Sequence, residues 1–355
     1  MNESVVLGHP GVVAPGAHSI QDIGRSFVSH DSVLNITTIP APWGMNPRQL
    51  RRLSRSTKCA MYAAQVAYTH APLTSGDGAL FIAMTHGATS FLQEFHDYMF
   101  DYGLDMASPN AFSNGVTNAS LGAISMMLSM RGGGMSLVGY ENAGLEAINH
   151  AARAIATRQY PMCLVGGAEE YSPLVVEVYQ RFGLFCGRKM PAWLPQSPEP
   201  ENNSAHIPIS EGSVFFSVAP VSVSNGDHPR CIYTPIDDPL GLDMPVDVII
   251  SGAGGGPQDS GECIVLEKQL GRGRKPAVLF SKPYCGELFG VGPLVSVALA
   301  RDILLNSTPY KPYPLEPSLQ KMAAADINFS TVRSVLVTAA ARDGDISAGL
   351  LHLDV

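Results

Sequence analysis

The chain has 355 residues, of which 45% are hydrophobic, so it can bury a large core in one large domain or two fused halves. The net charge of −8 argues against nucleic-acid binding, because no basic stripe is present to neutralise phosphates. Only 15% of residues are charged, and this favours an oligomer with a large buried face over an ordinary apolar-rich enzyme, since interface cores are depleted in charge.

The first half of the chain alternates between short apolar runs and helical patterns. Gly78–Met84 is a continuous apolar run, the sign of a strand buried on both faces. Residues 187–209 contain five prolines and no clear period, so we expect a long loop there. The expected strands are 4–8, 78–84, 135–139, 162–166 and 212–223, and the expected helices are 46–67, 88–102, 113–130 and 143–160.

The second half repeats this alternation after a loop-rich stretch at 224–245. Strands that alternate with helices predict a parallel sheet with right-handed crossovers. The similar order suggests an internal duplication, with an N-terminal half at 1–223 that carries the loop insertion 187–209 and a C-terminal half at 224–355. The expected strands are 246–250, 277–281, 334–338 and 348–353, and the expected helices are 258–270 and 294–305.

The spacing of cysteines and histidines predicts no metal site. Six cysteines are scattered without a C-x-x-C pair, which indicates reduced thiols in the cytoplasm rather than disulfides or a zinc site. His86 precedes an expected helix and is interpreted as polar packing. No signal peptide and no run of about 18 apolar residues is present, so we expect a cytoplasmic protein without a membrane span. We also expect no cofactor.

Several segments resemble the condensing-enzyme family, the β-ketoacyl synthases. They occur in the family's order and extend the similarity over about residues 4 to 355. The resemblance implies an α/β, thiolase-like fold in which two pseudo-duplicated halves form a layered αβαβα core. The matching segments are Arg131–Ser136 (family R-G-P-S-x-S), Asn149–Arg153, Val165–Glu170 (G-G-A-E), Ser210–Gly212 (E-G-A), Pro257 (the end of H-G-T-x-T-P) and Lys282–Gly290 (K-x-x-x-G-H-x-x-G).

The catalytic residues of the family are replaced at all three places. Glu141 stands where the family's T-A-C-x-S-G motif carries the nucleophilic cysteine. Gly252 and Glu287 stand where it carries two histidines. A carboxylate cannot take the role of a thiolate as an acyl carrier, because it would need to form an anhydride. The histidines that would stabilise the enolate are also missing, so the resemblance implies a subunit that does not condense.

One branch of the family matches this pattern. Tyr140–Ala147 is similar to the E-Q-A-G-G-L-D-A segment of chain length factors, although Glu141 replaces their usual glutamine. Such subunits form a heterodimer with an active ketosynthase, and the acyl carrier protein binds that complex. Arg51 and Arg52, with Arg55 and Lys58, form a basic run that is either a solvated helix face or a contact for the acidic carrier protein.

The helix at 113–130 corresponds to one that closes the partner's acyl tunnel at the subunit interface. Small side chains there leave volume, and volume sets the acyl length that a tunnel accepts. The hypothesis is that this subunit permits a long, rigid product such as a polyene. The alternative is that small residues merely let two helices pack closely. The expected tunnel or interface residues are Phe112, Gly115, Val116, Ala119 and Ser120.

Two other functions remain open from the sequence. Glu141 and Glu287 could form a buried carboxylate pair with a raised pKa, which would suit a stand-alone decarboxylase or hydrolase, or they could form salt bridges in a disused pocket. An isolated scaffold for the carrier protein is the third possibility. Cys285 is interpreted as a small filler rather than a displaced nucleophile.

Overall fold

The computed structural model describes residues 3–25, 35–182, 207–223, 229–254, 259–271, 276–311, 319, 322 and 327–354. Eleven strands within these residues form one mixed sheet in the order β4-β3-β5-β6-β1-β7-β11-β10-β8-β9, and β2 pairs with β6 outside this path. The strands are β1 Val5–Leu7, β2 Gly11–Val13, β3 Ala79–Met84, β4 Gly134–Val138, β5 Cys163–Glu169, β6 Gly212–Pro220, β7 Arg230–Ile236, β8 Val248–Ser251, β9 Ala277–Phe280, β10 Ser334–Ala340 and β11 Ile346–Asp354.

Helices lie on the outer faces of the two halves of the sheet and also between these halves. They are α1 Ile20–Arg25, α2 Pro47–Leu50, α3 Arg55–Thr69, α4 Thr89–Tyr102, α5 Pro109–Gly115, α6 Ala119–Leu128, α7 Ala143–Ala156, α8 Pro173–Arg181, α9 Ser260–Leu270, α10 Lys282–Cys285 and α11 Gly292–Asn306. Among the described residues, the 3₁₀ turns are η1 Leu104–Met106, η3 Phe289–Val291 and η4 Phe329–Thr331.

The two halves of the sheet have matching topologies. In the first half, β3 is parallel to β4 and β5, and β6 is antiparallel to β5 and β1. In the second half, β8 is parallel to β9 and β10, and β11 is antiparallel to β10 and β7. Strands β1 and β7 pair at the junction. The expected boundary at 223/224 falls between β6 and β7, and this exact position stays a prediction.

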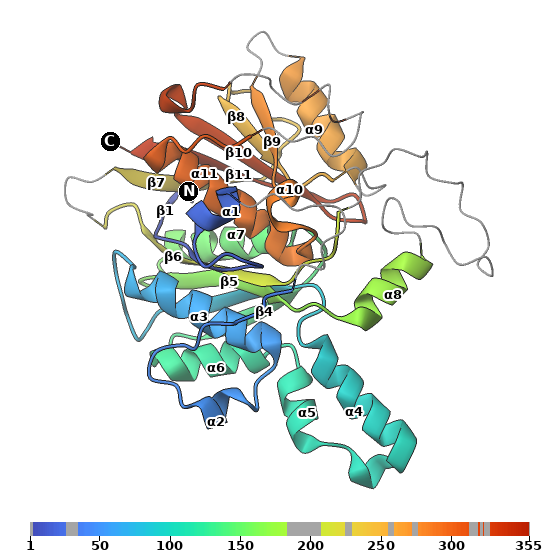
Figure 1. The fold of residues 1–355 in the computed structure, drawn as a ribbon. Coiled ribbons are helices and arrows are strands. Elements are labelled where there is room, and N and C mark those ends of the chain that lie inside the picture. The colour runs from blue at the N-terminus through green and yellow to red at the C-terminus, as the bar shows by residue number, and fades with distance from the viewer. Residues whose placement is uncertain are drawn as a thin grey trace.

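The layers are those of a thiolase-like αβαβα core (Figure 1). Helices α7 and α11 lie between the two halves of the sheet and contact each other. Helices α3 and α6 pack on the outer face of the first half, and α9 packs on that of the second. Small residues allow the central helices to approach closely, since a Cβ on Gly144 of α7 would lie 2.5 Å from the carbonyl oxygen of Gly290.

Helix α11 belongs to the core although its composition would suit a bilayer. Phe289–Asn306 is the one segment among the described residues with the length and hydropathy to cross a membrane, and 78% of it is buried inside the fold. Burial of this kind is expected for the central helix of a layered domain.

Three expectations about secondary structure are wrong. The expected helix 46–67 is divided into α2 and α3, because Ser54 caps a new helix by accepting a hydrogen bond from the Thr57 N–H. The expected helix 113–130 is divided into α5 and α6, since the backbone is extended at Val116. The stretch 224–245, which we expected to be rich in loops, contains β7. Pro235 weakens the local strand signal there.

The expected parallel pairing is confirmed for β3, β4 and β5, but the strands near the junction are antiparallel, so the sheet as a whole is mixed. Strands β10 and β11 follow one another through a short turn, and a short connection can join only antiparallel strands. Pro257 and most of the expected loop 187–209 lie outside the described residues.

Candidate functional site

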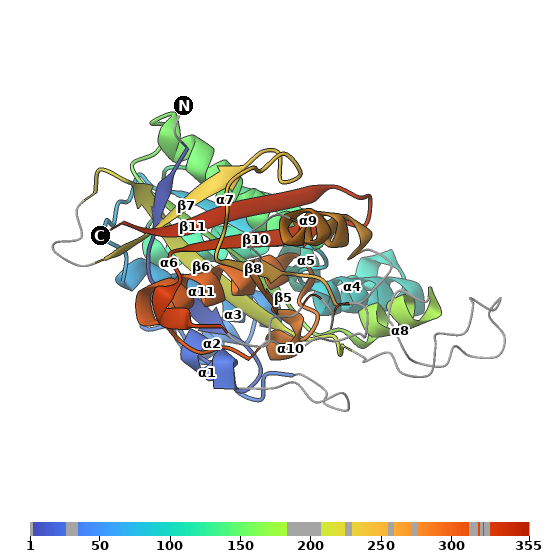
Figure 2. The ribbon, with the colours of Figure 1, turned by 90° about the horizontal axis from the view of Figure 1, so that it is seen from above.

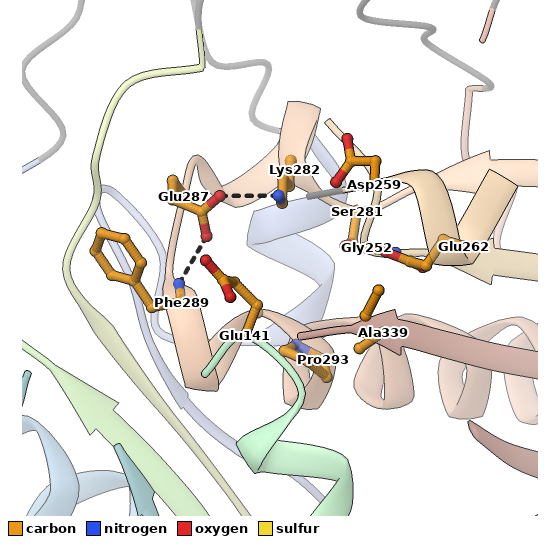
Figure 3. A pocket seen from close by; sticks show the side chains of 12 residues that line it. Glu141, Gly252, Asp259, Glu262, Ser281, Lys282, Glu287, Phe289, Pro293 and Ala339 are labelled. Carbon is orange, nitrogen blue, oxygen red and sulfur yellow. Dashed lines mark hydrogen bonds and ion pairs between the residues drawn. The ribbon is translucent and has the colours of Figure 1, made fainter. Parts of the chain in front are cut away.

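The three positions that the sequence singled out, 141, 252 and 287, surround one pocket in the interior (Figure 3). Glu141 lies in the turn between β4 and α7, Gly252 directly follows β8, and Glu287 follows α10. The pocket is also lined by Asp259, Glu262, Ser281, Lys282, Phe289, Gly292, Pro293, Ala339 and Ala340. The fold therefore brings the three positions together from both halves of the chain.

Arg342 neutralises Glu141. Its Nε atom lies 2.5 Å from Glu141 Oε1, and its guanidinium stands over the Tyr179 ring at 4.4 Å from the centroid, within the range of a cation–π contact. Burial and the nearby Glu287 raise the pKa of Glu141, and Arg342 acts in the opposite direction. Glu141 Oε2 is buried and has no hydrogen-bond partner within the described residues.

Lys282 neutralises Glu287 from the first turn of α10. The Lys282 Nζ atom lies 2.8 Å from Glu287 Oε2, and the Phe289 N–H donates to Glu287 Oε1 at 2.8 Å. Figure 3 shows both contacts, with the carboxyl groups of Glu287 and Glu141 pointing toward one another. Burial lowers the pKa of Lys282, but Glu287 and Asp259 outweigh this effect and raise it overall, so the amine stays charged.

Gly252 contributes a backbone N–H to a third buried carboxyl group. This N–H and the Ser251 hydroxyl donate to Glu262 Oε1 at 2.9 and 2.8 Å, and the Thr338 hydroxyl donates to the same atom at 2.8 Å. Burial raises the pKa of Glu262 to about 7. A Cβ added at Gly252 would lie 3.4 Å from Glu262 Oε2, so a small side chain fits at this position.

A histidine and two aromatic rings close the side of the pocket near Phe289. The Tyr179 hydroxyl lies 3.0 Å from His86 Nε2, and the His86 ring packs edge-on against Phe289 at 4.4 Å between centroids. Burial and Arg342 lower the pKa of His86 to about 4. His86 is therefore a neutral packing residue, and no group of potential ligands in the described chain could hold a metal ion.

The pocket has little free space. Its free volume is about 10 Å³, which is room for about one water molecule. None of the five cysteines in the described residues lines it. The Cys285 thiol donates to the carbonyl oxygens of Ser281 and Gly286, and burial raises its pKa to about 12. The thiolate needed for nucleophilic attack is thus suppressed at Cys285.

Sequence reasoning missed the two cations that neutralise the carboxylates. Lys282 was visible as part of a family motif, but its contact with Glu287 depends on the conformation of α10. Arg342 lies 201 positions beyond Glu141 in the turn between β10 and β11, and no local signal marks it. Tyr179 belongs to α8, a helix that was not expected from the sequence.

The expected tunnel residues lie apart from this pocket, on α5, α6 and the break between them. Gly115 permits close packing inside the chain, since a Cβ there would lie 2.8 Å from Leu92 Cδ2 of α4. The Ser120 hydroxyl hydrogen-bonds to the Thr57 hydroxyl at 2.8 Å. Phe112 is exposed, whereas Val116 and Ala119 are half-buried. A role in a partner's tunnel stays a prediction for these five positions.

Many exposed apolar side chains belong to the elements around these residues. Strand β4 is an edge of the sheet, and within the described chain only its β3 side is paired. Figure 1 shows α4 and α5 projecting from the body below the sheet, and Figure 2 shows α4 and α8 at one side of the molecule. The large exposed apolar side chains of this region are Tyr98, Phe100, Tyr102, Leu104, Met106, Phe112, Met126, Met135, Val138 and Tyr140.

Comparisons with known proteins agree with this architecture. Residues 37–192 match the family described as "Beta-ketoacyl synthase, N-terminal domain". No curated protein sequence matches the chain. One similar solved structure is "AntDE:AntF (apo): type II PKS acyl-carrier protein in complex with its ketosynthase bound to the hexaketide", with a TM-score of 0.74, 15% identity and 99% of each chain covered.

Two further solved structures have the same fold. "The ishigamide ketosynthase/chain length factor" is similar with a TM-score of 0.74, 15% identity and 99% of each chain covered. A β-ketoacyl synthase from Burkholderia phymatum STM815 is similar with a TM-score of 0.73, 13% identity and 100% of each chain covered. The fold therefore corresponds to that of thiolase-like ketosynthases over essentially the whole chain.

Proposed function

Because the chain carries a β-ketoacyl synthase N-terminal domain within a ketosynthase fold, we propose that it is a non-condensing chain length factor. It pairs with an active ketosynthase of a type II polyketide or fatty-acid-like system and shapes that partner's acyl tunnel. One observation carries the proposal: Glu141, Gly252 and Glu287, which by the resemblance stand where the family has its cysteine and two histidines, line one pocket.

The chemistry of the pocket supports the absence of condensation. A carboxylate at position 141 offers no thioester linkage to a growing chain. Glu287 carries negative charge where an enolate would need stabilisation. Lys282 and Arg342 bind the two carboxylates, and separating such buried pairs would leave uncompensated charge. The pocket is therefore held shut by its own side chains.

The apolar surface supports pairing with another subunit. An exposed edge strand such as β4 is a template for a strand of another chain. Exposed apolar patches of this extent mark interaction sites in soluble proteins. The low proportion of charged residues in the sequence has the same explanation. Like other systems of this kind, the pair would work in the cytoplasm.

A basic patch on α2 and the turn that follows supports contact with the acidic carrier protein in the complex. Arg48, Arg51 and Arg52 are exposed and form no ion pair within the described residues. Arg55, by contrast, is bound to the buried Glu211 at 2.5 Å. Three unpaired guanidinium groups on one side of the molecule provide electrostatic steering for an anionic partner.

The alternative function, a stand-alone decarboxylase or hydrolase, has one supporting observation. The raised pKa of Glu141 would suit a general acid. However, a substrate would have to displace Arg342 and enter a cavity that holds about one water molecule. The geometry therefore favours the pairing subunit.

Co-expression with a type II ketosynthase that carries an intact Cys-His-His set tests the proposal. We expect a stable complex that elongates malonyl units on the carrier protein, while the isolated chain neither becomes acylated nor releases CO₂ from malonyl carrier protein. In the complex, Glu141→Gln should leave elongation within about twofold of the native rate. Acylation of the isolated chain, or decarboxylation that Glu141→Gln abolishes, would overturn the proposal in favour of the alternative.

A further inference from the structure

The segment from α4 through η1 to α5, residues 89–115, forms an arm that has little packing of its own (Figure 1). Helix α4 is 14 residues long and none of them is buried, and η1 has no buried residue either. Inside the arm, the contacts are between α4 and α5, such as the Phe95 and Phe112 rings at 5.4 Å. A helix of this length is marginal in water without a packed face, so the arm requires another surface.

An aromatic stripe marks the side of the arm that such a surface would cover. Phe91, Phe95, Tyr98 and Tyr102 recur every three or four residues on α4, a spacing that places them on one helical face. The Tyr98 and Tyr102 rings are 5.7 Å apart. Beyond the stripe, Phe100 is 78% and Leu104 is 76% exposed. Aromatic and methionine side chains of this kind form the centres of protein interfaces.

Carboxylates flank this stripe, and His96 is the one basic side chain on the arm. Glu94, Asp97, Asp101 and Asp105 are exposed, and the arm contains no lysine or arginine. None of the four forms an ion pair within the described part of the chain. Asp101 also lies in the last turn of α4, where the helix dipole disfavours negative charge, and Asp105 follows in η1. These charges therefore do not stabilise the arm itself.

We propose that the arm selects the partner of this chain. Its aromatic stripe docks on an apolar surface of the ketosynthase that is bordered by lysine or arginine, and its carboxylates pair with that border. A second copy of this chain fits poorly, because a two-fold interface places the same patch of each subunit against its twin and would oppose like charges. The inference rests on the proposed function, since it takes the partner to be the ketosynthase.

Two matched variants test the charges of the arm. Asp97→Asn with Asp101→Asn removes two negative charges from α4. Asp238→Asn with Glu267→Gln removes two from exposed positions in the second half of the chain, and the asparagine retains the Oδ1 atom that accepts from the Gly241 N–H. The dissociation constant of the ketosynthase complex is measured at several salt concentrations, and the oligomeric state of each isolated chain is measured by light scattering.

We expect the arm variant to bind the ketosynthase about three- to thirtyfold more weakly, with a smaller dependence on salt, and to gain a homodimer when isolated. The control variant should match the native chain in both measurements. Phe100→Ser with Leu104→Ser should weaken binding about tenfold or more while its circular dichroism spectrum stays native, since both side chains are exposed in the isolated chain.

The outcomes separate this inference from the proposed function. If the native chain binds the ketosynthase and the arm variant binds equally well, the charge selection is wrong while the proposed function stands. If both double variants of the arm bind like the native chain, the arm is not in the interface. If the native chain binds no ketosynthase or forms a tight homodimer, both proposals are overturned.

Discussion

The central pocket and the α4–η1–α5 arm distribute charged and apolar groups in opposite ways. In the pocket, charged side chains are buried and neutralised by Lys282 and Arg342. On the arm, aromatic side chains are exposed and acidic ones have no ion-pair partner within the described chain. Buried ion pairs add little stability by themselves, and exposed apolar surface lowers solubility. The contrast teaches that charge is compensated inside the fold, whereas the arm exposes apolar and acidic side chains.

The largest effect is expected from Lys282→Met, which leaves Glu287 buried without its counter-charge. Removing one partner of a buried ion pair costs about 3–5 kcal/mol, and urea unfolding would measure it. Lys282→Met with Glu287→Gln should recover most of this loss. If Lys282→Met alone were as stable as the native chain, the Lys282–Glu287 pair would not stabilise the pocket.

A smaller loss, about 1–3 kcal/mol, is expected from Arg342→Met. The Arg342 side chain is partly exposed, and water can replace some of its contacts. Adding Glu141→Gln should restore stability, because the neutral amide no longer needs the guanidinium. The same unfolding measurement checks both variants. If Glu141→Gln alone stabilised the chain as much with Arg342 as without it, the two residues would be independent.

The pH dependence of stability should reveal the buried carboxyl group of Glu262, which differs from the exposed carboxyl groups. Burial raises the pKa of Glu262 to about 7 in the folded chain, from 4.5. As the pH rises, Glu262 therefore loses its proton first in the unfolded chain. The contribution of Glu262 to the stability of the folded chain is complete below about pH 4.5 and disappears as the pH rises through 7. Glu262→Gln should reduce the fall in unfolding free energy over this interval by up to about 1.4 kcal/mol per pH unit.

The matched control for this measurement is Glu267→Gln, which alters an exposed carboxylate on the same helix, α9. Its profile should follow that of the native chain. The amide of Glu262→Gln keeps an oxygen that can accept from Ser251 and Thr338. Identical pH profiles for the native chain and Glu262→Gln would contradict the raised pKa.

The smallest effect on stability is expected at the break between α5 and α6. Val116 is half-buried, and by the resemblance it stands where ketosynthases carry a larger gating side chain. In the complex, Val116→Phe should shorten the products. It should change the free energy of unfolding by no more than about 0.5 kcal/mol. Mass spectrometry of carrier-bound intermediates would measure the product lengths. Unchanged product lengths would leave only the interpretation that small residues permit close helix packing.

Regular patterns made most of the fold predictable from the sequence. The buried strand β3, the central helices α7 and α11, and the helix α9 all lie close to the expected positions, because each has a clear apolar period or run. The breaks after α2 and α5 depend on single capping and backbone conformations, and these are weak signals within a continuous helical pattern. Strand β7 needed its neighbours β1 and β11 to be recognised.

The sequence by itself determined the motifs that carry the resemblance, because motif order and spacing are local properties of the chain. Glu141, Gly252 and Glu287 were singled out from these motifs without coordinates, and their match to the family's catalytic positions stays a prediction. Only the tertiary structure decided that Arg342 lies 2.5 Å from Glu141 and that Tyr98 and Tyr102 of the α4 stripe remain exposed. Both depend on how the sheet brings distant segments together or leaves them apart, which no local pattern specifies.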